Sequence, residues 1–133
     1  MEGFLGEGEK TDKLHPEKLS PSYDKTASIE LPELSIKLIE LVSPFEGEGE
    51  IHTNFHDIYI VVEGEATVLT GENLIGSKEI EPGEYRGGDI TSAVEYSIKK
   101  GDVFVIPAGL AHKVIVKEGK LVQWVIKCRT ESS

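Results

Sequence analysis

Short apolar runs separated by turn residues dominate the chain from residue 28 onward. In 34–42 (LSIKLIELV), Ile36 and Leu38 alternate with polar neighbours, which is a period of two. Such alternation is typical of a strand with one buried face. Ser43-Pro44 follows directly and marks its end. We therefore expect a half-buried strand over 34–42.

The strongest strand signals lie further along the chain. The run 57–63 (DIYIVVE) is apolar, Gly64-Glu65 is a turn signal, and 66–70 returns, so this pair is predicted to form a hairpin. Further strands are expected at 103–106, 112–117 and 121–127. In the last of these, Trp124 is expected to pack in the barrel or at a dimer face. Roughly eight strands and no convincing helix indicate an all-β sandwich or barrel.

The chain divides into three parts by its composition. Residues 1–24 are acidic and contain the breakers His15-Pro16 and Ser20-Pro21, so we expect an N-terminal arm. The following 25–128 is predicted to be a single domain, since 133 residues fit one compact unit. Within it, 71–98 is rich in glycine and interrupts the strand pattern, so we expect an insertion there.

Charge and composition exclude several classes of protein. Fourteen basic against 24 acidic residues leave a net charge of −10, which opposes binding to nucleic acid or to anionic membranes. No apolar run reaches the ~20 residues that span a bilayer. The N-terminus lacks the basic and apolar regions of a signal peptide. With a single cysteine, Cys128, no intramolecular disulfide forms, and a cytoplasmic protein is expected.

Residues 101–112 (GDVFVIPAGLAH) carry the most specific motif. Gly101-Asp102 turns the chain into a short strand, and Pro107-Ala108-Gly109 turns it back, so that His112 begins the next strand. This segment resembles the second motif of the cupin superfamily, whose histidine is a metal ligand. The resemblance covers roughly residues 29–127 and implies a cupin-type double-stranded β-helix (jelly-roll barrel) and a homodimer.

The first cupin motif is degraded in this chain. When it is aligned on Gly64, Asp57 takes the place of the family's glutamate, His52 that of the second histidine and Glu50 that of the first. The resemblance thus implies that His52, Asp57 and His112 hold a metal, with Glu50 as a fourth candidate. His56 is an alternative to Asp57, although adjacent residues on a strand point to opposite faces.

Two imidazoles and a carboxylate suit ferrous iron and also manganese, nickel or zinc. These ligands do not select one divalent ion. Asp57 is one methylene shorter than the glutamate of the motif, which leaves an alternative open. In that alternative the protein is a cupin without metal, whose His52 and His112 are hydrogen-bonded in a polar pocket.

Within the expected insertion, 85–89 (YRGGD) joins an arginine to two glycines. The guanidinium of Arg86 offers a planar fork that suits a carboxylate, so Arg86 is the candidate substrate-binding residue. Pairing of Arg86 with a surface acid is the alternative. Tyr59, Tyr85 and His56 are candidates for acid–base catalysis, and nothing in the sequence selects among them.

These residues favour a metal-binding cupin that binds, and as an enzyme transforms, a small organic acid or sugar-like molecule. The resemblance implies chemistry of the oxygenase or isomerase type, which the fold alone does not choose. The alternative is a non-catalytic small-molecule-binding or sensor module. Exposed strand edges and the arm at 1–24 favour a homodimer on physical grounds as well.

Overall fold

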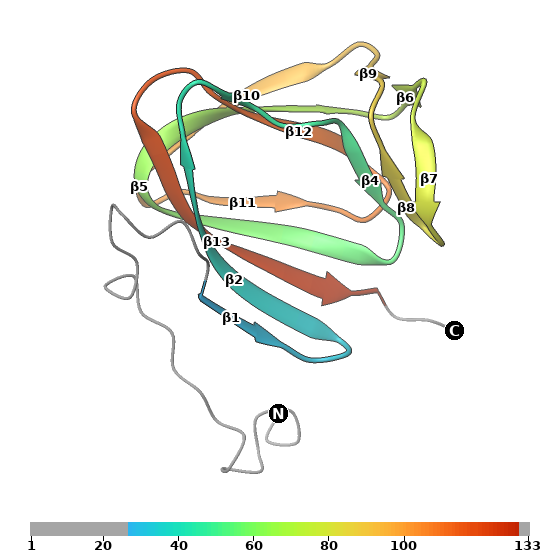
Figure 1. Cartoon of the computed structure of the whole chain (residues 1–133), viewed down its shortest axis with the longest axis horizontal. Coiled ribbons are helices and arrows are strands. Elements are labelled where there is room, and N and C mark those ends of the chain that lie inside the picture. Colours follow the sequence, from blue (N-terminus) through green and yellow to red (C-terminus); the bar gives the residue numbers. More distant parts are fainter. Residues whose placement is uncertain (1–26, 131–133) are drawn as a thin grey trace.

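The computed structural model describes residues 27–130, which form strands and no helix (Figure 1). Nothing in this range is a helix long and apolar enough to cross a membrane. The strands are β1 (Ala27–Glu30), β2 (Leu34–Val42), β3 (Phe45–Glu46), β4 (Glu50–His52), β5 (Phe55–Gly71), β6 (Leu74–Ile75), β7 (Lys78–Glu81), β8 (Glu84–Arg86), β9 (Asp89–Ile90), β10 (Val94–Lys99), β11 (Val103–Ile106), β12 (Ala111–Val116) and β13 (Lys120–Arg129).

The strands form two antiparallel layers that share one long strand, β5. One layer has the order β1-β2-β13-β5-β11. The other has the order β10-β5-β12-β4-β8-β7, with β3 also paired to β12. Figure 1 shows the layers facing each other and joined by the bend of β5. The all-β barrel predicted from the sequence is therefore observed.

The long strand β5 corrects one prediction. It runs unbroken from Phe55 to Gly71, so the hairpin turn expected at Gly64-Glu65 is wrong. Gly64 has a φ of 84°, and a Cβ there would collide with the carbonyl oxygen of Lys120. The ladder with β13 also skips Val62, which is a β-bulge. Glycine and bulge bend the strand without ending it, because each half finds its own partner strands in one of the two layers.

The inward positions of the barrel differ between its two ends. Towards one end the buried side chains are mostly apolar, and the buried amide of Gln123 lies opposite Val61. The apolar ones are Tyr59, Val61, Ala66, Val68, Ile98, Val116 and Leu121, whereas Ile106 lies opposite Asp57 at the level of the other end. We call the apolar end the closed end. At the other end, the buried side chains His52, Asp57 and His112 are polar or charged. We call that end the mouth.

The stretch 71–98, expected as an insertion, contains strands β6 to β10. Three of them extend the second layer, because β8 pairs with β4, β7 pairs with β8 and β10 pairs with β5. The remaining two, β6 and β9, pair with each other in a separate two-stranded sheet. Most of these strands are short, which explains why the sequence pattern indicated fewer strands than the structure has. The expected arm at 1–24 lies outside the described residues.

The outer face of the first layer is apolar. Trp124 lies opposite Leu38 on one side and Ile60 on the other, so it is on this face and not inside the barrel. Two cross-strand rows make up the face: Leu38, Trp124, Ile60 and Val103, and beside them Ile29, Ile36, Ile126, Ile58 and Val105. Val103 and Val105, on β11, are 62% and 55% exposed.

Candidate metal centre

Strand register brings the predicted ligands together at the mouth. Glu50 and His52 lie on one side of β4, two residues apart, and His112 of β12 is directly opposite Glu50. The turn between β11 and β12 is fastened to β4, because the Gly109 N–H donates a hydrogen bond to the His52 carbonyl oxygen at 2.9 Å. Asp57 enters from β5 in the facing layer. Residues from three strands thus converge on one point.

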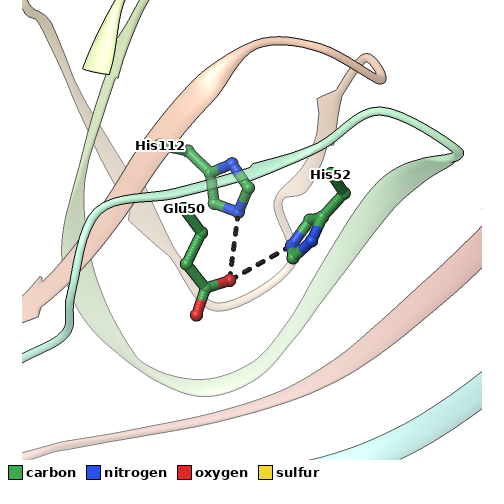
Figure 2. Close-up of side chains that lie close together, drawn as sticks. All are labelled: Glu50, His52 and His112. Carbon is green, nitrogen blue, oxygen red and sulfur yellow. Dashed lines mark ion pairs between the residues drawn. The ribbon is translucent and has the colours of Figure 1, made fainter. Parts of the chain in front are cut away.

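The distances in this cluster match those of a metal site. Glu50 Oε1 lies 3.1 Å from His52 Nε2 and 3.7 Å from His112 Nε2, and Figure 2 shows the carboxylate reaching both rings. Asp57 Oδ2 lies 3.4 Å from each of the same two nitrogens. Ligand atoms that sit about 2.0–2.2 Å from a shared ion are separated by about 3–3.5 Å. The cluster therefore has the spacing that a single divalent ion requires.

His112 is prepared to act as a ligand. Its Nδ1 donates to the carbonyl oxygen of Leu110 at 3.1 Å, which leaves the lone pair on Nε2. That Nε2 is buried and has no hydrogen-bond partner among residues 27–130, and the same holds for Oδ1 of Asp57. Buried polar atoms are rarely left without a partner. A cation bound beside Nε2 gives His112 the partner that it lacks, and Asp57 presents its other oxygen, Oδ2, to the same point, while Oδ1 faces the Lys127 ammonium at 3.6 Å. These residues therefore fit a metal.

A further carboxylate orients His52 from behind. Glu84 of β8 lies directly opposite His52 in the ladder, and its Oε1 is 2.6 Å from His52 Nδ1. A carboxylate that accepts the second N–H of a ligating histidine fixes the ring and raises its basicity. Glu84 thus holds the Nε2 of His52 toward the cluster.

The carboxylates of the cluster change the pKa of His52. Burial opposes its charged form, but hydrogen bonds to Asp57 and Glu50 outweigh burial and raise the pKa of His52 to about 10. Burial likewise opposes ionisation of the two acids. The close contacts of Asp57 Oδ2 with both histidines at 3.4 Å, and of Glu50 with His52 at 3.1 Å, overcome it, so that the pKa of Asp57 and that of Glu50 are lowered from their ordinary values. Without metal, the cluster therefore pairs ionised carboxylates with a protonated His52, and a bound metal ion takes the place of that proton.

Two basic side chains border the cluster. Arg86 Nε lies 3.5 Å from Glu50 Oε2, because the two residues are opposite each other in the β4–β8 ladder. Lys127 is opposite Asp57 in the β5–β13 ladder, with its Nζ 3.6 Å from Asp57 Oδ1. The same Nζ lies 3.2 Å from His52 Nε2. Positive charge thus already reaches the site from both layers.

The candidates for acid–base catalysis lie in different places. Tyr59 is buried in the core against Phe104, and burial together with the charges of Asp57 and Glu50 raises its pKa. Tyr85 alternates with Glu84 and Arg86 on β8 and so points to the other side of that strand. His56 is exposed, and its Nδ1 accepts a hydrogen bond from the Ala108 N–H at 2.9 Å. None of these three side chains contacts the cluster through a hydrogen bond or ion pair within the described range.

Glu84 and Lys127 are neighbours of the cluster that the sequence analysis missed. Glu84 shares a strand face with Arg86, so a strand prediction over 84–86 implies that both reach the mouth. Lys127 is the one basic residue in the run 121–127 (LVQWVIK) and lies on the opposite face from Ile126. A basic residue on the inward face of a core strand is the sequence signal that could have identified Lys127 as a neighbour of the cluster.

Comparisons with known proteins identify the family. The model of the family described as Cupin matches residues 49–127, more than half of the chain, so the chain belongs to the cupin family. No curated protein sequence matches it. The barrel described above is therefore the cupin fold, a single set of cupin strands that includes both motif regions.

Solved structures support the same fold. A protein from Bacillus halodurans has a TM-score of 0.58 at 18% identity, over 76% of this chain and 66% of that chain. KdgF from a Halomonas species has a TM-score of 0.57 at 15% identity, over 80% and 79% of the two chains. A cupin-2 domain containing protein from Shewanella frigidimarina has 0.53 at 19%, over 79% and 80%. At these identities the likeness shows the fold alone.

Proposed function

We propose that this cupin binds one divalent metal ion through His52, His112, Glu50 and Asp57, and that it binds and transforms a small organic acid beside it. One observation carries the proposal. The buried Nε2 of His112 has no partner among the described residues and faces carboxylate oxygens and a second imidazole at metal-site spacing. Iron, manganese, nickel and zinc all suit these ligands.

Each residue then has a defined task. A bound divalent ion supplies Lewis-acid polarisation of a substrate oxygen. Glu84 keeps the His52 ring in position through its 2.6 Å contact with Nδ1. Arg86, which is 43% exposed beside Glu50, is placed to pair with a substrate carboxylate from the open side. Reaction class, whether of the oxygenase or the isomerase type, is decided by the substrate and metal together.

Metal titration tests this proposal. Protein freed of metal with a chelator is titrated with Mn²⁺, Ni²⁺, Zn²⁺ and, without oxygen, Fe²⁺ in a calorimeter. We expect one ion to bind per chain, and His112→Ala to weaken binding by about 100-fold or more. His56→Ala is the matched control, because His56 contacts the β11–β12 turn and not the cluster. Absence of binding by all four ions overturns the proposal.

A specific contact favours the second candidate, a binding or sensor cupin that works without metal. The Lys127 ammonium lies 3.2 Å from His52 Nε2 and 3.6 Å from Asp57 Oδ1, so it supplies positive charge where a metal ion would. In this alternative, the wild-type protein takes up none of the ions and Lys127→Met does. A small ligand then raises the melting temperature while its mass stays unchanged after long incubation.

We further propose that two chains pair through the apolar outer face of the first layer. Its row of Ile36, Ile126, Ile58 and Val105 lies across four strands, and Val105 is 55% exposed. The three isoleucines of this row are partly exposed, and apolar surface that stays accessible to solvent is typical of association sites. Light scattering tests it. Val105→Lys is expected to convert a dimer to a monomer, whereas a wild-type monomer contradicts the proposal.

A further inference from the structure

A cleft opens beside the candidate metal centre. Its volume is about 680 Å³, and it lies between β8 with the β7–β8 turn on one wall and β1, β2 and β13 on the other. Glu84, Arg86 and Lys127 line it, and each of them also contacts the cluster. The four cluster residues do not line the cleft themselves, but these three side chains join the two, so cleft and cluster are adjacent.

The cleft collects basic side chains from a strongly acidic protein. The whole sequence contains only two arginines, Arg86 and Arg129, and both line this cleft. Lys37 and Lys127 line it as well. Three glutamates share the walls, of which Glu84 is engaged by His52. In a chain of net charge −10, this concentration of cations distinguishes the cleft from the rest of the molecule.

Strand register explains the arrangement of these cations. Lys127 and Arg129 are two residues apart on β13, so both point to the same face and their Cα atoms lie about 7 Å apart. Lys37 of β2 is opposite Val125, the preceding residue on that face. Arg86 comes from β8, on the facing wall. The cations thus continue outward from the cluster and do not end at it.

The inner and outer cations differ in their partners. Arg86 and Lys127 contact carboxylates of the cluster, at 3.5 Å from Glu50 and 3.6 Å from Asp57. Among the described residues, no ion pair involves Arg129 or Lys37. The Arg129 guanidinium lies over the Phe55 ring, 5.6 Å from its centroid. This cation–π contact occupies no N–H group of the guanidinium, so its donors remain available to a carboxylate, which can accept two hydrogen bonds from them.

We propose that this cleft binds a small dicarboxylate, with one carboxylate beside the cluster and Arg86, and the other held by Arg129 at the outer end. Lys37 and Lys127 add positive charge along the wall between these two positions. This proposal rests on the proposed function, since the cluster and its bound ion anchor the inner carboxylate. It adds that the second anionic group of the ligand is recognised by residues that hold no metal.

Calorimetry with ligands of matched length tests the proposal. Protein loaded with Mn²⁺ is titrated with succinate and glutarate, with butyrate as the monocarboxylate control, and with inorganic phosphate. We expect a dicarboxylate to bind at least ten times more tightly than butyrate, and more tightly than phosphate. Equal binding of butyrate and the dicarboxylates overturns the proposal. Tighter binding of phosphate also overturns it and assigns the cleft to a single compact anion.

Variants locate the second carboxylate. Arg129→Gln is expected to reduce dicarboxylate affinity about tenfold while butyrate and Mn²⁺ affinities stay unchanged, and Arg129→Lys is expected to lie between. Lys99→Gln removes the same charge from an exposed strand away from the cleft and is expected to change none of these affinities. If Arg129→Gln leaves the preference for dicarboxylates intact, the proposal fails. Because Mn²⁺ binding is measured separately, loss of the metal proposal is distinguishable from this result.

Discussion

The two ends of the barrel are built partly from the same strands, but their inward-facing side chains differ in polarity. At the closed end, inward residues such as Val68 and Leu121 are apolar and fully buried, so they stabilise the fold by leaving water. At the mouth, the inward residues His52, Asp57 and His112 are 2–3% exposed and bear polar or charged groups, whose burial costs free energy unless they are paired. The difference shows that stability and ligand binding are separated along the barrel axis.

Because of this separation, the largest loss of folding stability is expected for a substitution at the closed end. Leu121→Ala removes a fully buried side chain from the core and is expected to lower the free energy of unfolding by about 2–5 kcal/mol. Urea denaturation measures the loss. The Mn²⁺ affinity of the folded variant is expected to stay within about twofold of wild type. A metal affinity that falls together with stability contradicts the separation of the two ends.

A substitution behind the mouth is expected to weaken metal binding while leaving the free energy of unfolding almost unchanged. Glu84→Gln keeps the size of the side chain but weakens the charge-assisted contact with His52 Nδ1. Partners of ligating histidines are worth about 10- to 100-fold in metal affinity, so a loss of this size is expected in a Mn²⁺ titration. The free energy of unfolding is expected to change by less than about 1 kcal/mol. Glu81→Gln, on the exposed strand β7, is the matched control.

The pH dependence of stability sharpens the same comparison in protein freed of metal. Burial is outweighed by the close contacts with the two histidines, which hold the pKa of Asp57 below its ordinary value of 3.8, so its contribution is complete above that pH and is lost as the pH falls further. The pKa of His52 is raised from 6.5 to about 10, so its contribution is complete below pH 6.5 and is lost as the pH rises through 10.

Unfolding by urea across this range is therefore expected to show a maximum between about pH 4 and 6.5, with a loss of about 1–2 kcal/mol on the acidic side. Asp57→Asn is expected to flatten the acidic loss. An equally steep acidic loss in Asp57→Asn would place the responsible carboxylates elsewhere. Leu121→Ala serves as the comparison from the closed end and is expected to shift the whole curve without changing its shape.

The smallest effect is expected where the two ends meet. Tyr59 lies between Asp57 and Val61 on the inward face of β5, and its raised pKa keeps it protonated near neutral pH. Tyr59→Phe is therefore expected to change the free energy of unfolding and the Mn²⁺ affinity by less than about 1 kcal/mol each. Any turnover with a dicarboxylate should persist in this variant. Loss of turnover in Tyr59→Phe would assign Tyr59 to catalysis.

Strand and turn signals predicted the all-β fold, and the resemblance to the cupin motifs selected His52, Asp57, His112 and Glu50, whose role as metal ligands stays a prediction. Alternation identified β2, and the Gly101-Asp102 and Pro107–Gly109 turns delimited β11. They failed at Gly64, because a glycine with positive φ serves a bulge in a continuous strand as well as a hairpin turn. The side of β5 that is buried changes at this bulge: the buried positions are odd-numbered from Asp57 to Val61 and even-numbered from Ala66 to Thr70.

The parts of the site that could not be predicted depend on pairing between distant strands. His52 and His112 are recognisable by motif, whereas Lys127 becomes a neighbour of Asp57 only through the β5–β13 ladder. Glu84 likewise reaches His52 through the register of β4 with β8. The hydrophobic pattern of one strand does not show which residue of another strand it will pair with. Arg86 was singled out as a substrate-binding candidate from its local chemistry, and that role stays a prediction; the structure places it next to Glu50.

The shared strand β5 has a consequence for how the protein is made. It pairs with β10, β11, β12 and β13, and Phe55 is partnered by Arg129 at the far end of the described chain. Pairings so distant in sequence are slow to close, because the entropy of a long loop is lost before the contacts form. On the ribosome, β5 must therefore wait for β13 to emerge, and its unpaired edges need protection from other nascent chains until synthesis has passed residue 129.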